Sequence, residues 1–96
     1  MGRPRTPAAG HEWVVPRLLD AEECDRAARA LDLPPQQARI VSLILQGKRD
    51  KQIAAAMGLQ RPTVRTHLAR IFSRLGVADR MELVLRVFAD HLKSNR

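Results

Sequence analysis

A row of four aliphatic residues in the second half of the chain constrains the fold more than any other feature of the sequence. Val64, Leu68, Ile71 and Leu75 are spaced i, i+4, i+7 and i+11, so one face of an α-helix carries all four side chains. Gly76 follows directly, and glycine is the residue type that most readily ends a helix. Because such a helix must bury its apolar face, the rest of the chain is expected to pack around it.

The other segments also show helical spacing and contain few runs of β-branched residues, so we predict an all-α fold. Asp20, Asp50 and Asp79 stand where a carboxylate accepts hydrogen bonds from the first turn of a helix, and Glu23 completes a capping box with Asp20. Three aromatic residues in the whole chain leave a core built from aliphatic side chains. The predicted helices cover residues 21–31, Pro34 to Gly47, Asp50 to Gly58, Arg61 or Pro62 to Gly76, and Asp79 to about Leu92.

Positive charge is concentrated in the middle of the sequence. The formal net charge is +7, yet residues 1–46 carry six basic and six acidic side chains, and residues 76–96 carry four basic and three acidic ones. Residues 47–75 carry seven basic side chains and one acidic side chain. A basic excess confined to one segment is typical of a nucleic-acid interface.

The predicted helix over residues 61–75 presents its arginines on the face opposite the aliphatic row. No acidic residue in this helix is available to pair with them. An α-helix fits the major groove of double-stranded DNA, where one arginine can donate to both acceptors of a guanine edge. We therefore expect the guanidinium groups to form one cationic surface shaped for the duplex. The residues on this face are Arg61, Arg65, Thr66, Ala69, Arg70 and Ser73.

The sequence carries little that supports catalysis or a cofactor. Cys24 is the single cysteine, which excludes an internal disulfide and a cysteine metal cluster. His67 lies beside the aliphatic row and is predicted to be a structural histidine that is hydrogen-bonded to the backbone. Helix capping and an ion pair explain Asp79, Arg80 and Glu82. We expect no enzymatic activity, and so no catalytic residue, no metal and no cofactor.

Four short motifs in register carry a resemblance to a known family of DNA-binding domains. They are Gly47 with Lys51 and Ile53-Ala54, Thr63-Val64-Arg65 with His67-Leu68, Ile71 with Arg74-Leu75-Gly76-Val77, and Arg80 with Glu82. Together they resemble the LuxR/GerE family over a little more than half of the chain. The resemblance implies a four-helix LuxR-type helix-turn-helix domain, here with an extra short N-terminal helix. It is similar to the stand-alone members of the family, which lack a sensor domain.

The resemblance also implies roles for individual residues. Arg65 and Thr66 are the expected base readers, with Ala69 close enough to touch a thymine methyl group. Phosphate contacts are expected from the scaffold helix, from the start of the recognition helix and from its later turns. The residues expected to contact phosphates are Lys51, Arg61, Thr63, Arg70 and Arg74.

The sequence departs from the family pattern at several polar positions. The first helix of the family usually opens with threonine and an Arg-Glu pair, where this chain has Pro34 and Gln36-Gln37. Arg49-Asp50 replaces a Ser/Thr-Asn pair. Gln60 replaces the serine that usually precedes the recognition helix, which removes a possible phosphate contact. These departures concern the details of docking on DNA and leave the fold prediction unchanged.

The predicted last helix has two apolar faces. Leu83, Val84 and Val87 are expected to face the core. A second apolar row on so small a domain needs a partner, and we expect a second copy of the chain, as the resemblance also implies. The alternative is that the residues 13–15 of the same chain and the short N-terminal helix cover it. The second row, predicted to form the dimer interface, is Met81, Leu85, Phe88 and Leu92.

The sequence divides into a tail over residues 1–12, a segment with the short helix over 13–32, the DNA-binding domain over 33–92 and a tail over 93–96. The short helix packs on the core, or it contacts RNA polymerase or another regulator. No apolar run approaches the length of a membrane span, and the N-terminus lacks the apolar stretch of a signal peptide. We therefore expect a cytoplasmic protein without a membrane partner.

We interpret the chain as a sequence-specific transcription regulator that binds double-stranded DNA as a dimer. Two alternatives remain open. One is a promoter −35 reader, because Leu33-Pro34-Pro35-Gln36-Gln37 is similar to the start of region four of a sigma factor. The other is a protein-interaction adaptor or inhibitor that acts on another regulator or on RNA polymerase.

Overall fold

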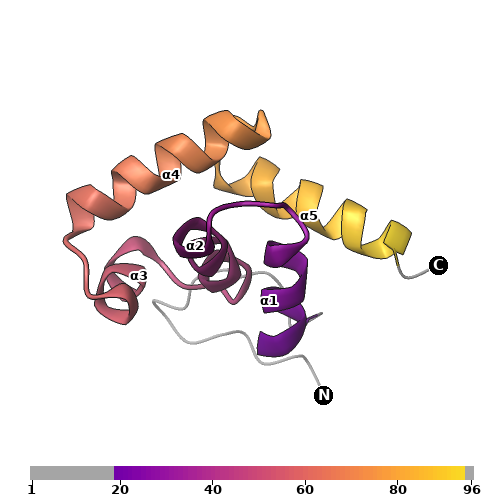
Figure 1. Ribbon diagram of the computed structural model, residues 1–96, viewed down its shortest axis with the longest axis horizontal. Coiled ribbons are helices and arrows are strands. Elements are labelled where there is room, and N and C mark those ends of the chain that lie inside the picture. The colour runs from indigo at the N-terminus through magenta and orange to yellow at the C-terminus, as the bar shows by residue number, and fades with distance from the viewer. Residues whose placement is uncertain (1–18, 95–96) are drawn as a thin grey trace, which may run out of the picture.

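The computed structural model describes residues 19–94, which form five α-helices and no strand (Figure 1). The helices are α1 (Ala21–Arg29), α2 (Pro35–Leu45), α3 (Asp50–Met57), α4 (Arg61–Leu75) and α5 (Arg80–Ser94). The prediction of an all-α fold is confirmed. The predicted N-terminal tail and residues 13–15 lie outside the described residues.

The central helix of the fold is α2, which contacts α1, α3 and α5 (Figure 1). Pro35 occupies its first turn, where the missing N–H of proline costs no hydrogen bond. Ile40 and Val41 are completely buried. Ser42 is buried as well, and its hydroxyl donates a hydrogen bond to the carboxylate of Asp25 in α1. Both apolar packing and a polar contact therefore hold α1 against α2.

The short N-terminal helix α1 belongs to the core. The Asp20 carboxylate accepts a hydrogen bond from the Glu23 N–H at 2.8 Å, and the Glu23 carboxylate accepts one from the Asp20 N–H at 3.0 Å, so the predicted capping box is confirmed. Cys24, Ala27 and Ala28 are buried on the face that packs on α2 and α5. Burial raises the pKa of the Cys24 thiol. The small-residue stripe of α1 is thus used inside this chain.

The ends of α3 and α4 are fixed by two glycines in the left-handed region. Gly58 has φ +69° and Gly76 has φ +71°, a conformation in which other residues are strained. After Gly58 the Leu59 N–H donates to the Ala54 carbonyl at 2.9 Å, which closes the end of α3. Both helix ends were predicted from the sequence. The turn after Gly58 sets the direction in which α4 leaves α3.

The predicted N-cap of α3 was wrong. The helix begins at Asp50 and is preceded by Arg49, whose backbone N–H donates to the Gln52 side chain at 2.9 Å. The Asp50 carboxylate instead accepts a hydrogen bond from Arg80 Nη2 at 2.7 Å, and Arg80 Nη1 donates to the Lys48 carbonyl at 2.7 Å. We call these two contacts the Arg80 clasp. They join the start of α5 to the start of α3.

The start of α5 is capped as predicted. The Asp79 carboxylate accepts from the Glu82 N–H at 2.9 Å, and the Glu82 carboxylate accepts from the Ala78 N–H at 2.8 Å. Leu83 and Val87 are buried in the core, which confirms the prediction for this face of the helix. The outer face of α5 is consequently turned away from the other helices.

Candidate nucleic-acid interface

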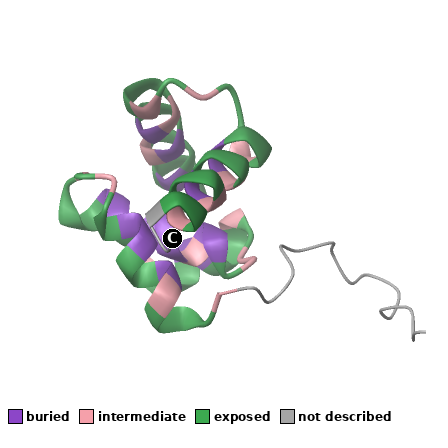
Figure 2. Ribbon diagram, turned by 90° about the vertical axis from the view of Figure 1, so that its right-hand side faces the viewer, coloured by how far each residue is buried: buried purple, intermediate pink, exposed green. Residues whose placement is uncertain are grey.

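The aliphatic row of α4 faces the core. Val64 and Ile71 are completely buried, Leu68 is buried, and Leu75 is half-buried at the end of the helix. Buried residues gather where the helices meet, and exposed residues cover the outer turns (Figure 2). The orientation that the sequence predicted for α4 is therefore the one observed.

The outer face of α4 combines small side chains with arginines. At about 100° per residue, Thr66 and Ser73 point most directly away from the core row, and Ala69 and Arg70 lie at equal angles on either side of them. The helix contains no acidic residue. All of the predicted outer residues are exposed, namely Arg61, Arg65, Thr66, Ala69, Arg70 and Ser73.

The arginines of α4 form two flanks and not the single surface that we expected. The same helical rotation places Arg61 and Arg65 on one side of the small residues and Arg70 and Arg74 on the other. All four are exposed, and none of them pairs with another residue in the described part of the chain. The expectation of a single surface was wrong because it considered only that each of the four lies outside the core row, and not the side of the row on which each one falls.

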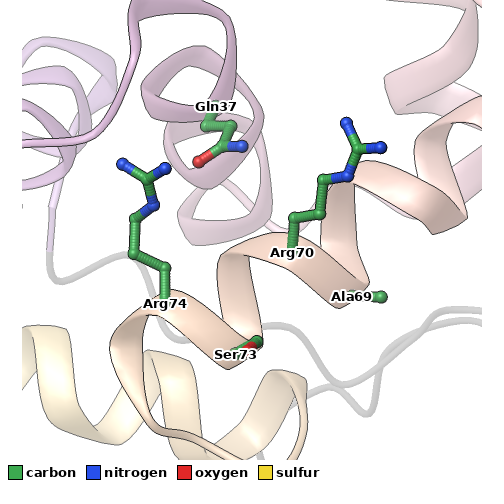
Figure 3. A pocket seen from close by; sticks show the side chains of 5 residues that line it. All are labelled: Gln37, Ala69, Arg70, Ser73 and Arg74. Atoms are coloured by element: carbon green, nitrogen blue, oxygen red, sulfur yellow. The ribbon is translucent and has the colours of Figure 1, made fainter.

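The second flank borders a shallow, open recess between α4 and the start of α2 (Figure 3). Arg74 extends from α4 alongside α2, Arg70 points to the opposite side, and the Gln37 amide lies between them in this view. Gln37 is only 8% exposed, and its Oε1 is buried without a hydrogen-bond partner among the described residues. Ala69 and Ser73 complete the lining. We call this feature the Gln37 recess.

Thr66 makes a hydrogen bond that limits what its hydroxyl can do. Thr66 Oγ1 donates to the Pro62 carbonyl at 3.1 Å, one turn earlier in α4. With its proton engaged, the hydroxyl oxygen retains lone pairs that accept hydrogen bonds. The outward side of Thr66 thus offers an acceptor and a methyl group.

The remaining predicted phosphate-contact residues lie near the start of the same interface. Lys51 is exposed on α3, the helix that packs against α4. Thr63 is exposed in the first turn of α4, on the flank opposite Arg61. The α4 carbonyls at the other end are also satisfied, because the Arg86 guanidinium of α5 donates to the Leu75 carbonyl. A side-chain contact from α5 therefore fixes the C-terminal end of the arginine-bearing helix.

The prediction for His67 was wrong in its detail. The side chain is half-buried, but Nδ1 is buried and has no hydrogen-bond partner among residues 19–94, so the predicted bond to the backbone is missing. The described residues contain no group of three or more His, Cys, Asp or Glu side chains that could hold a metal ion. None of the described helices has the length and apolar character needed to cross a membrane.

The outer face of α5 is apolar. Met81 is 66% exposed, Leu85 60% and Leu92 66%, and these three are the exposed large hydrophobic residues of the described chain. Phe88, the fourth member of the predicted row, is half-buried. Three of the four members of the predicted row are therefore exposed, and they lie on one face of α5.

Two features of this interface were missed at the level of sequence. One is the burial of Gln37. In the sequence it is a polar residue in the first turn of a helix, and its neighbours along the chain do not predict that it is buried. The other is the partner of Arg80. The sequence predicted an ion pair near this position, but Asp50 is 30 residues away and only the folded chain brings the two together.

Comparison with known proteins agrees with this geometry. A family model described as bacterial regulatory proteins, luxR family, matches residues 32–87. Two curated relatives, each named HTH-type transcriptional regulator MalT, are from Klebsiella pneumoniae subsp. pneumoniae and from Klebsiella pneumoniae strain 342. Each is 32% identical over 73 residues, which is 76% of this chain but 8% of the relative. No solved structure gives a significant match.

The matched range contains α2, α3 and α4 and the start of α5, which are the elements that carry the buried row, the two arginine flanks and the Arg80 clasp. The resemblance found in the sequence motifs is thereby confirmed. The chain belongs to the luxR family of bacterial regulatory proteins and carries the helix-turn-helix DNA-binding domain of that family.

Proposed function

We propose that this chain is a sequence-specific regulator of transcription that inserts α4 into the major groove of double-stranded DNA and acts as a dimer. The observation that carries the proposal is the outer face of α4. It presents four exposed arginines, no acid, and a centre of small side chains. The family match supports the same assignment over the alternative of a sigma-type promoter reader.

The small centre of α4 suits close approach to the base edges. An α-helix with its side chains is about 10–12 Å across, and the major groove is about 12 Å wide. With Thr66, Ala69 and Ser73 at the centre, α4 can lie deep in the groove, where Arg65 reaches a guanine edge. Thr66 accepts a hydrogen bond from the amino group of adenine or cytosine, or its methyl group contacts a thymine methyl. Ala69 contacts a thymine methyl.

The arginine flanks and neighbouring side chains hold the helix in register. A major groove is bounded by two phosphate backbones, so a helix within it turns one flank toward each strand. In this arrangement Arg61 contacts phosphates of one strand, and Arg70 and Arg74 contact phosphates of the other. Lys51 and Thr63 add phosphate contacts beside the start of α4. Such contacts position the protein and carry no sequence information of their own.

The apolar row on α5 is the surface through which we propose that two copies associate. The α1 stripe that was an alternative partner surface is already buried against α2 and α5, whereas Met81, Leu85 and Leu92 remain exposed. A second copy would cover this row with the same row by two-fold symmetry. Linking two domains makes the second docking event intramolecular, which raises the effective affinity. The expected DNA site is roughly palindromic, with half-sites about one helical turn apart.

Two measurements on the full chain test the proposal. Selection of bound duplexes from a random pool should return a two-fold symmetric site, and titrations at several salt concentrations should show a steep loss of affinity. About four to six phosphate contacts per subunit give a log–log slope of similar size. Binding of random and selected duplexes with equal affinity would contradict sequence-specific regulation. Failure to retain any duplex at low salt, together with capture of a defined regulator, would favour the adaptor alternative.

A further inference from the structure

We infer that the Gln37 recess binds one phosphate of the DNA backbone and that the neutral side chain of Gln37 keeps it available for this purpose. The inference rests on the proposed function and deepens it. It assigns a defined anion site to one flank of α4, with a residue of α2 as part of that site.

The charge of the recess is the first argument. Arg70 and Arg74 both line it, and neither forms a hydrogen bond or ion pair with another residue in the described part of the chain. The remaining lining residues, Ala69, Ser73 and Gln37, carry no charge. Two guanidinium groups beside one opening, with no carboxylate among the lining residues, favour an anion with several acceptor oxygens.

The unsatisfied amide of Gln37 is the second argument. A side chain that is 8% exposed ordinarily has partners for its polar atoms, yet Oε1 of Gln37 has none within residues 19–94. Rotation of the terminal amide exchanges its oxygen and nitrogen positions with little change of shape. Because the present Oε1 position is almost inaccessible, a bound phosphate meets the amide only when the Gln37 side chain turns its amide nitrogen toward the recess, where a phosphate oxygen accepts from it.

The position of the recess is the third argument. It lies on the flank of α4 that is opposite Arg61 and Arg65 and next to Ser73, one of the central outward residues. When α4 occupies the groove, this flank faces one of the two bordering backbones. A phosphate of that strand is therefore the anion that the docked geometry brings to the recess.

The discriminating variant is Gln37→Glu, with Gln36→Glu as its matched control. Both positions lie in the first turn of α2, where a carboxylate is favourable to the helix dipole, and both variants add one negative charge. Gln36 is exposed, whereas a carboxylate at position 37 would lie between the two arginines and neutralise them. Thermal unfolding of both variants shows whether the fold is retained.

The affinities of the full chain and the two variants for one selected duplex are measured across a salt series. We expect Gln37→Glu to bind about tenfold more weakly and to reduce the salt slope by about 0.9, the value of one phosphate contact. Gln36→Glu should stay within about threefold of the unchanged chain and keep its slope. In an Arg74→Ala background, the additional loss caused by Gln37→Glu should shrink at least threefold, since the two changes then remove the same contact.

The outcomes separate the inference from the proposed function. If the unchanged chain binds DNA but the two glutamate variants behave alike, the recess holds no phosphate and the inference is overturned while the proposed function stands. If Gln37→Glu unfolds, the single variants Arg70→Ala and Arg74→Ala decide, because both residues are exposed. Salt slopes equal to that of the unchanged chain in both would overturn the inference. If the unchanged chain binds no duplex, the proposed function is overturned, and with it the inference that rests on it.

Discussion

The helices α4 and α5 are each 15 residues long and pack against the same small core, but their outer faces have opposite chemistry. The outer face of α4 carries arginines around small residues, and that of α5 carries exposed methionine and leucine. Their inner faces have the same chemical character, because both are rows of aliphatic residues. The comparison teaches that burial fixes where a helix lies, whereas the face left outside determines what it can bind.

The two outer faces also differ in what they require. Arginine side chains are well solvated, so α4 needs no partner to be stable in water. Exposed apolar side chains on a small domain are costly unless another surface covers them, so α5 is the face that calls for a protein partner. A substitution on the outer face of α4 should therefore weaken DNA binding without changing the association of two copies, and a charged residue on the outer face of α5 should prevent that association without unfolding the domain.

The largest effect is expected from Leu85→Arg on the apolar face of α5. We expect a monomer by sedimentation and a loss of at least about 100-fold in affinity for a palindromic duplex, because the second docking event is no longer intramolecular. The substitution adds positive charge, which by itself would strengthen attraction to DNA. Asp90→Arg, at an exposed position turned about 140° from Leu85 on the same helix, should retain the dimer mass. An unchanged mass for Leu85→Arg would exclude this interface.

The next largest effect is expected from Arg65→Ala on the outer face of α4. Loss of a bidentate base contact should cost about 1–3 kcal/mol of binding free energy and relax the preference at one base pair. Lys51→Ala should weaken all sequences alike and lower the salt slope by about 0.9. Arg39→Ala, an exposed arginine of α2, controls for the removed charge. Equal losses on selected and random duplexes for Arg65→Ala would show that it reads no base.

A smaller effect is expected from Arg80→Ala, which breaks the Arg80 clasp between α3 and α5. We expect a loss of about 1–2 kcal/mol in the free energy of unfolding, because the Lys48 carbonyl and the Asp50 carboxylate both lose a donor. The ion pair itself contributes little of this, since Arg80 and Asp50 are 37% and 27% exposed. Denaturant unfolding measures the difference. Arg80→Lys should restore only part of it, because one ammonium group does not reproduce the two-pronged contact.

The smallest effect is expected from Asp79→Ala at the start of α5. Removal of the side chain that accepts from the Glu82 N–H should cost about 1 kcal/mol in the free energy of unfolding. Asp90→Ala removes the same charge from the exposed part of the helix and should leave stability within about 0.5 kcal/mol. Equal stability of the two variants would mean that the cap contributes nothing measurable.

The sequence predicted well what depends on neighbouring residues. Helical spacing identified the buried row of α4, and glycines with positive φ marked the ends of α3 and α4. Local capping was also predictable at Asp20 and Asp79, whose partners lie three residues away. In each case the signal and the structure lie within a single helix or directly at its end.

The sequence predicted poorly what depends on residues far apart in the chain. Asp50 is a residue type that often caps a helix, but its carboxylate accepts from Arg80 at the start of α5, 30 residues later in the chain. The surroundings of Gln37 are set by α4, which begins more than 20 residues later, and spacing within α2 cannot reveal them. The assignment of α1 to the core likewise rests on contacts with α2 and α5. The recess between Arg70, Arg74 and Gln37 also came from the fold, because it joins α4 to the start of α2.

The Arg80 clasp has a consequence for how a dimer would measure DNA. If two copies meet through α5, the separation of their α4 helices depends on how rigidly each α5 is attached to its own α3–α4 unit, and the Arg80 clasp is one of the contacts that make this attachment. Inserting one base pair between half-sites rotates one of them by about 35° around the duplex axis. A stiff attachment cannot follow this rotation, so discrimination between spacers would originate in an arginine that reads no base.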